Sequence, residues 1–202
     1  MRTKMNLKEI KQEAYTRFHQ DGLLDILAGL MLFGYGIGMV TGITTFTAIS
    51  FLPIMFYQPL KNGITVPRIG MVKFQDKETE RRKLSFSLLV GIFLLIGLLI
   101  FFLFGRQSLP IRLDTLLREN IFLIFGIMMA MMFIGLGYFM ANNRMNLYAG
   151  WIILAFAIGQ FFLAPNEEIV VPVAGGVIFL AGLFYLIRFL LQNPKVDLDV
   201  SE

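Results

Sequence analysis

The stretch IFLIFGIMMAMMFIGLGYFMA, residues 121–141, contains no charged residue and no alternation of polar with apolar positions. At about 1.5 Å rise per residue, a helix of this length crosses a hydrocarbon core of about 30 Å. A strand of a transmembrane barrel would instead show about 10 residues with strict alternation. Because lipid cannot satisfy open backbone groups, the stretch is expected to be a membrane-spanning helix.

Five further apolar runs have similar lengths and stand between polar or turn-forming residues; they cover residues 23–40, 43–60, 84–104, 147–164 and 169–191. With the first stretch they predict an all-α fold, a six-span transmembrane helical bundle over residues 23–192. Hydrophobic residues form 56% of the chain and charged residues 16%, against about 25% charged in a typical soluble domain. Composition therefore excludes a disordered chain, a fibrous chain and most soluble folds.

The segments outside the six runs carry their own patterns. In residues 1–22, Leu7, Ile10, Ala14 and Phe18 recur at helical spacing, which predicts a short amphipathic helix. This helix would lie on the cytoplasmic membrane surface or pack on the end of the bundle. Residues 105–120 contain Pro110 followed by apolar residues at helical spacing, which predicts another short interfacial helix. Residues 193–202 form a polar cytoplasmic tail.

The loop of residues 61–83 is the longest polar stretch between two runs. Residues 64–74, ITVPRIGMVKF, are β-prone and contain a proline and a glycine, so an extended or hairpin-like cytoplasmic element is expected there. The loop ends in a basic collar, Arg81, Arg82 and Lys83. This collar is either an orienting anchor next to the third run or a docking surface for a protein or anionic lipid.

The distribution of basic residues orients the bundle. Of the 18 Lys and Arg residues, 15 lie in the N-terminal segment, the loop of residues 61–83, the turn after the fourth run and the C-terminal end. The other three, Arg106, Arg112 and Arg118, follow the third run. The positive-inside rule then predicts a multi-pass protein of the plasma (inner) membrane with both termini in the cytoplasm. The net charge of +4 is accordingly read as a topology signal, and no nucleic-acid partner is expected.

Motifs for chemistry are scarce. The chain has no cysteine and one histidine, His19, which excludes thiolate chemistry and the common multi-histidine metal sites. No phosphate-binding loop or nucleophile elbow occurs. The sequence therefore predicts a protein that is not an enzyme, with no cofactor and no metal. Gly34, Gly38 and Gly42, spaced by four, predict a helix-packing face.

Polar residues at the edges of the runs are the remaining candidates for function. A cytoplasmic-side cluster would contain Asp21, Asp25, Arg68 and Arg188. In it Asp25 reaches water, pairs with a base such as Arg68 or Arg188, or serves as a proton- or cation-sensitive carboxylate in a transport path. Tyr35, Gln58 and Gln160 are candidates for a transport path or for hydrogen bonds between helices.

The segments DGLLDILAG, residues 21–29, and VPRIGMVKF, residues 66–74, resemble parts of uncharacterised bacterial multi-span membrane proteins. The resemblance implies no activity, cofactor or catalytic residue. It does favour one shared cytoplasmic-side site for Asp25 and Arg68. The hypothesis is that an ion pair between them fixes the loop against the base of the first span.

Two functions are compatible with this sequence. The first is a non-enzymatic structural, assembly or regulatory partner, which contacts the bilayer, anionic lipid head groups and a protein partner or a second copy of itself. The second is a small, dimeric transporter or channel with Asp25 near the cytoplasmic end of the path.

Overall fold

The computed structural model describes residues 18–69, 111–140 and 142–194, together with the single positions 87, 91 and 95. Within these residues every regular element is helical and no strand occurs. The chain divides into two compact units, residues 1–74 with 171–202 and residues 75–170. Each unit is described by itself below.

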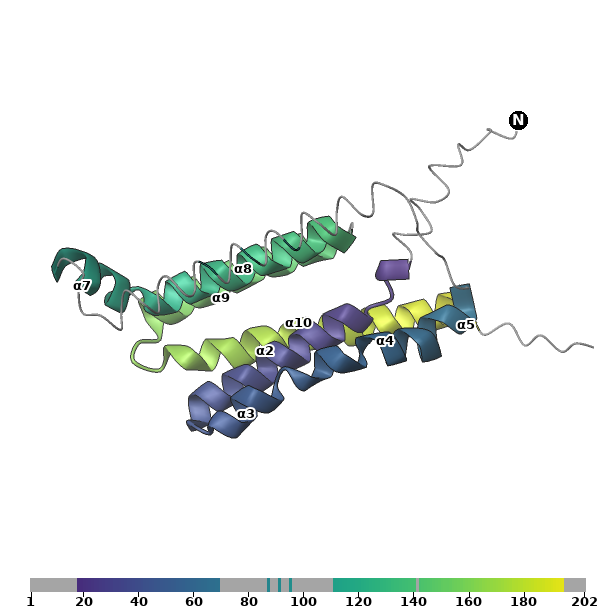
Figure 1. Cartoon of the computed structure of the whole chain (residues 1–202), viewed down its shortest axis with the longest axis horizontal. Coiled ribbons are helices and arrows are strands. Elements are labelled where there is room, and N and C mark those ends of the chain that lie inside the picture. Colours follow the sequence, from purple (N-terminus) through teal and green to yellow (C-terminus); the bar gives the residue numbers. More distant parts are fainter. Residues whose placement is uncertain are drawn as a thin grey trace, which may run out of the picture. The chain divides into compact units, whose positions relative to one another are not determined.

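Four helices are long and apolar enough to cross a membrane: α2 (Leu23–Thr41), α8 (Ile121–Met140), α9 (Asn143–Phe162) and the segment Glu167–Gln192, which contains α10 (Val170–Gln192). They correspond to the first, fourth, fifth and sixth predicted runs. The short predicted helix after Pro110 is present as α7 (Ile111–Glu119). By length and composition, these four helices (Figure 1) are those of a helical membrane protein.

Local chemistry sets both ends of α2. Gly22, immediately before the helix, has φ 84°, a left-handed conformation that glycine adopts without steric cost. The carboxylate of Asp21 accepts a hydrogen bond from Leu23 N, one of the orphan amides of the first turn. At the other end Gly42 has φ 68° and its N–H donates to Met39 O, so it terminates the helix.

The second predicted run is an interrupted helix. It comprises α3 (Thr44–Ile49), the 3₁₀ turn η1 (Leu52–Phe56), α4 (Tyr57–Leu60), the π-helical turn η2 (Lys61–Thr65) and α5 (Val66–Ile69). Pro53, Pro59 and Pro67 explain the interruptions, because each proline lacks the N–H that would bond to the carbonyl four residues earlier and its ring clashes with that carbonyl. Such breaks are commonly absorbed as 3₁₀ or π turns.

The prediction of an extended or hairpin-like element after this run is wrong for residues 64–69. These residues are helical and belong to η2 and α5. Val66 and Thr65 are β-prone by residue type, but the helix continues through them from the preceding apolar segment. Tertiary context overrides such local propensities readily. Residues 70–74, the rest of the predicted element, lie outside the described residues, as do residues 75–83 of the same loop.

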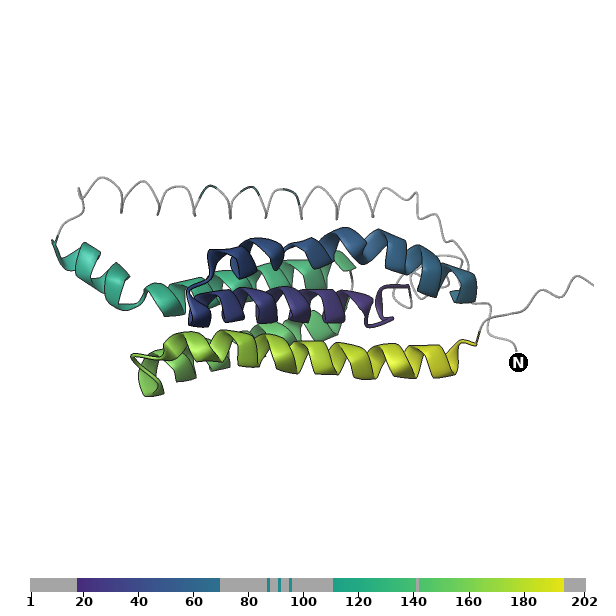
Figure 2. The same cartoon turned by 90° about the horizontal axis from the view of Figure 1, so that it is seen from below.

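In the first unit α2 and α10 run antiparallel in close contact (Figures 1 and 2). A Cβ added at Gly29 would lie 2.3 Å from Phe179 N, one at Gly36 2.3 Å from Pro172 N, and one at Gly175 2.3 Å from Phe33 N. Gly22 and Gly182 repeat this close approach nearer the other end. We call these five residues the glycine seam. It brings two backbones together without side chains between them, as small residues do in membrane helix pairs.

The second unit contains a helical hairpin of α8 and α9, which lie side by side in Figure 1. Its contact is made by side chains: the rings of Phe122 and Phe156 have centroids 4.6 Å apart, and Phe156 fills the space above Gly126. The hairpin turns at Asn142, whose side chain accepts a hydrogen bond from Arg144 N and so caps α9. The 3₁₀ turn η3 (Glu167–Ile169) follows α9.

Two predicted segments lie mostly outside the described residues. They are the amphipathic helix in residues 1–22 and the third run in residues 84–104. Of the former, Phe18 and His19 are helical; of the latter, positions 87, 91 and 95 are helical. The polar tail is described only to residue 194.

Candidate functional site

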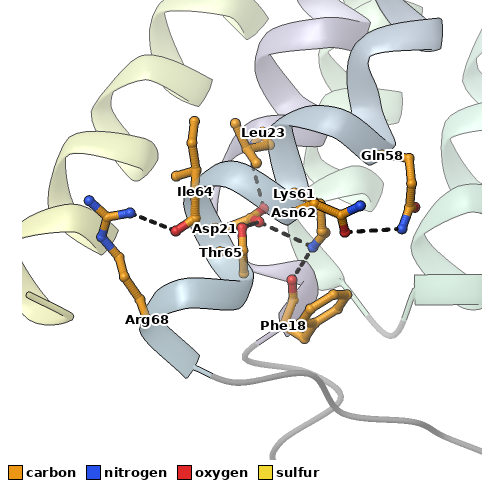
Figure 3. A network of polar contacts seen from close by, with 9 residues as sticks. All are labelled: Phe18, Asp21, Leu23, Gln58, Lys61, Asn62, Ile64, Thr65 and Arg68. Carbon is orange, nitrogen blue, oxygen red and sulfur yellow. Dashed lines mark hydrogen bonds and ion pairs between the residues drawn. The ribbon is translucent and has the colours of Figure 1, made fainter. Parts of the chain in front are cut away.

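A buried polar network joins the start of α2 to the turn η2 (Figure 3). Asp21 Oδ2 lies 3.1 Å from Lys61 Nζ, and both side chains are at most 2% exposed. The same oxygen accepts a hydrogen bond from Thr65 Oγ1, while Oδ1 accepts from Leu23 N at 3.2 Å. One carboxylate thus connects two segments about forty residues apart in sequence.

The ammonium group of Lys61 has further partners besides Asp21. Its Nζ donates to Phe18 O, lies 4.0 Å from the centroid of the Phe18 ring and 5.5 Å from that of Tyr57. Aromatic faces attract cations at such distances because of the ring quadrupole. We call Phe18, Asp21, Tyr57, Lys61 and Thr65 the lysine cluster.

Two electrostatic effects act in opposite directions on the pKa of Lys61. Burial lowers the pKa of Lys61 below its ordinary value, because it disfavours the charged ammonium; the charge of Asp21 and its hydrogen bond act in the opposite direction. A buried pair of this kind gains little over well-packed apolar residues. Loss of one partner alone is costly, because the other charge stays buried and uncompensated.

The local sequence explains how the cluster is assembled. Gly22 has no side chain, so the backbone directly after Asp21 can approach α10, where a Cβ at position 22 would lie 2.7 Å from both Gly182 O and Leu186 N. Lys61 and Thr65 are the first and last residues of η2 and are four apart, so they share one face of the helix. That face is turned towards Asp21 (Figure 3).

The other predicted members of the cytoplasmic-side cluster occupy neighbouring elements. Asp25 is 1% exposed in α2, one turn after Asp21. Arg68 donates through Nη1 to Ile64 O at 2.6 Å, and its side chain extends to one side of the lysine cluster (Figure 3). Arg188 is exposed on α10. The predicted pairing of Asp25 with Arg68 stays a prediction.

The three candidates for a transport path or helix-to-helix bonds do not form one group. Tyr35 in α2 is half-buried, with its ring 6.4 Å from that of Phe51. Gln58 in α4 is exposed and donates to Asn62 Oδ1 at 3.4 Å. Gln160 belongs to the other unit, where its Nε2 donates to Glu119 O at 2.8 Å and links α9 to the end of α7.

The predicted glycine face has two different roles. Gly38 lies against Thr47 and Gly34 against Ser50, so both pack on α3 and the turn that follows it. Gly42 has no atom within 4 Å of an added Cβ and instead ends α2. The basic collar of Arg81, Arg82 and Lys83 lies outside the described residues.

Sequence reasoning missed Lys61 and Thr65 as partners of Asp21, and it missed the glycine seam. A signal for the seam was present, because Gly22, Gly29 and Gly36 are spaced by seven, as are Gly175 and Gly182. Lys61 gave a weaker signal. It directly follows an apolar run, where a lysine ordinarily extends to the membrane surface, and nothing local shows that it turns inward.

No family model, curated protein or solved structure matches this chain. Among the described residues, no group of three or more His, Asp or Glu side chains could hold a metal ion. The geometry defines a protein of membrane-type helices in which the buried charges of Asp21 and Lys61 pair at one end of the close contact between α2 and α10.

Proposed function

We propose that this chain is a multi-pass protein of the bacterial plasma membrane that acts by association, as a structural, assembly or regulatory partner, and catalyses no reaction. The supporting observation is the surface of its helices. On α10, Val173, Val177, Leu180, Phe184, Ile187 and Leu191 are all exposed and follow one another at steps of three or four residues. A continuous apolar stripe on such a helix is suited to lipid or to another helix.

The proposed association is tested by co-purification from native membranes at low detergent. A partner present in fixed ratio should be lost when Arg81, Arg82 and Lys83 are changed together to Gln, if the basic collar is the docking surface for a protein. Reconstitution into vesicles with and without anionic lipid separates the other source of binding, the lipid head groups. A chain that purifies alone and ignores vesicle charge would contradict the proposal.

The proposal also includes a topology of six spans with both termini in the cytoplasm. The supporting argument is the asymmetry of 15 basic residues against three. Since the chain has no cysteine, single cysteines report topology without background. Gln20→Cys should be protected from a membrane-impermeant maleimide in intact cells, and Asn166→Cys, in the exposed turn after α9, should react. The reverse pattern would overturn the orientation.

A transporter or channel is the second candidate, and the interrupted helix of residues 44–69 favours it. Broken helices expose backbone groups that coordinate ions in transporters. Asp21, which pairs with Lys61 of this segment, and Asp25, one turn later in α2, are both buried carboxylates. Flux into proteoliposomes that depends on pH and disappears in Asp25→Asn would support transport. Absence of flux for protons, monovalent cations and small solutes would leave association as the function.

A further inference from the structure

We propose that Phe18, Asp21, Tyr57 and Thr65 form a binding site for a primary ammonium ion, which Lys61 fills as a tethered ligand. A free primary ammonium ion would occupy the site when the Lys61 side chain is withdrawn. The start of α2 would then be held in place by whichever ammonium group, that of Lys61 or that of a free ion, fills the site. This inference is independent of whether the protein associates or transports.

The groups that the structure places around Lys61 Nζ are ones that bind an ammonium ion. Asp21 supplies a carboxylate oxygen at 3.1 Å from Nζ, and Phe18 supplies a backbone carbonyl oxygen. The rings of Phe18 and Tyr57 supply the aromatic faces. Carboxylate, carbonyl and aromatic faces together are the groups that recognise organic cations in proteins.

The hydrogen bonds select a primary ammonium over a quaternary one. A lysine ammonium carries three N–H donors, and two of its acceptors are Asp21 Oδ2 and Phe18 O. A quaternary ammonium has no N–H, so Phe18 O would lose this donor and Asp21 Oδ2 would keep only Thr65 Oγ1. The lost hydrogen bonds cost free energy. Thr65 donates to the same carboxylate oxygen and so holds it in position independently of the cation.

The site does not depend on the Lys61 backbone for its shape. Phe18 and Asp21 precede α2, and Tyr57 and Thr65 flank Lys61 by one turn on either side. Lys61→Ala removes three methylenes and the ammonium, the atoms of n-propylammonium. The vacated space therefore fits this ion, which can restore the lost hydrogen bonds and the charge balance with Asp21.

Hydrogen–deuterium exchange of the full chain in lipid nanodiscs tests the proposal on the peptide that covers residues 18–26. Lys61→Ala should speed exchange there by about tenfold or more, because local opening follows the loss of buried contacts. Added n-propylammonium should slow it towards the wild-type rate, whereas 1-propanol, a neutral analogue of similar size, should not. Asn62→Ala, at the exposed neighbouring position, is the matched control and should exchange as the wild type.

The double variant Asp21→Asn, Lys61→Ala decides whether the amine binds at this site. Its exchange should not respond to n-propylammonium, because the carboxylate is gone. If Lys61→Ala does not accumulate in membranes, accumulation becomes the readout: the single variant should need the amine in the medium and the double variant should not. Unchanged exchange in Lys61→Ala, or an equal response to the amine in both variants, would overturn the proposal.

Discussion

Each of the two units contains an antiparallel pair of membrane-type helices, and the polar residues that hold the start of one helix differ between the units. In the first unit the start of α2 is held by a buried ion pair between Asp21 and Lys61, far apart in sequence. In the second unit the start of α9 is held by a neutral cap, Asn142, that bonds its own neighbour Arg144. The first arrangement couples distant segments, and the second stabilises one turn.

The apolar contacts differ in the same way. Along the glycine seam an added methyl group would meet backbone atoms of the facing helix, such as Phe179 N beside Gly29. Between α8 and α9 the atoms facing Gly126 and Gly159 are those of side chains, chiefly Phe156 and Phe122. Backbone atoms of a packed helix cannot move alone, whereas the end of a ring can. The first unit should therefore tolerate substitution less well.

The largest effect is expected for Lys61→Met, which keeps an unbranched side chain one heavy atom shorter and removes the charge. Asp21 then stays buried without a counter-ion, and loss of one partner of such a pair costs about 3–5 kcal/mol. Unfolding in mixed micelles should show this loss of free energy. Adding Asp21→Asn should restore part of it, since an uncharged pair is tolerated.

Asn62→Met is the matched control, because Asn62 lies on the same turn and is exposed; its free energy of unfolding should change little. An equal loss in Asn62→Met and Lys61→Met would show that the turn, not the charge, is being disturbed. No recovery in the double variant would show that Asp21 is not the group left uncompensated.

Gly29→Ala should have the second largest effect and lower the free energy of unfolding by about 3 kcal/mol. This value is at the upper end of ordinary overpacking costs, because the added Cβ would meet backbone atoms. Gly150→Ala in α9 is the control, since an added Cβ there meets nothing within 4 Å. That variant should be neutral or more stable by about 0.5–1 kcal/mol from helix propensity alone. Equal stability of the two variants would show that α2 and α10 do not approach as closely as the seam requires.

Composition and run length were sufficient to predict a helical membrane protein and to locate four spanning helices within a few residues. They could do so because lipid leaves the backbone few alternatives. The interruptions of the helix after Ile49 were harder to predict from the sequence. Pro53 was a visible signal, but the π turn at Lys61–Thr65 depends on how Pro67 is accommodated within a helix that continues around it.

The candidate site was predicted only in part. Asp21 was identified because it lies one turn before Asp25, so that the two acids can share a helix face at the cytoplasmic boundary. Its partner could not be identified, since pairing with Lys61 depends on how η2 faces the start of α2, a tertiary property. The glycines were similarly ambiguous: spacing by four and spacing by seven both occur in α2, and only the facing helices distinguish the surface that packs on α3 from the one that packs on α10.

Gly159→Ala should have an intermediate effect, about 1–2 kcal/mol, within the usual range for overpacking. The nearest atom to its added Cβ is Phe122 Cε1 at 2.8 Å, the far end of a ring that can shift. Combining it with Phe122→Leu, which shortens that ring, should reduce the extra loss in a double-mutant cycle of unfolding free energies. A cost as large as that of Gly29→Ala would remove the distinction between the glycine seam and the side-chain contact of α8 with α9.

The smallest effect is expected at the neutral polar end of the second unit. Asn142→Ala removes the acceptor for Arg144 N and should cost about 1 kcal/mol, the ordinary value of a helix N-cap. Asn142→Ser retains a side-chain oxygen and should cost much less, since serine caps about as well as asparagine. If Asn142→Ala instead cost as much as Lys61→Met, the turn between α8 and α9 would have to be a second long-range polar centre, because a local cap cannot supply that free energy.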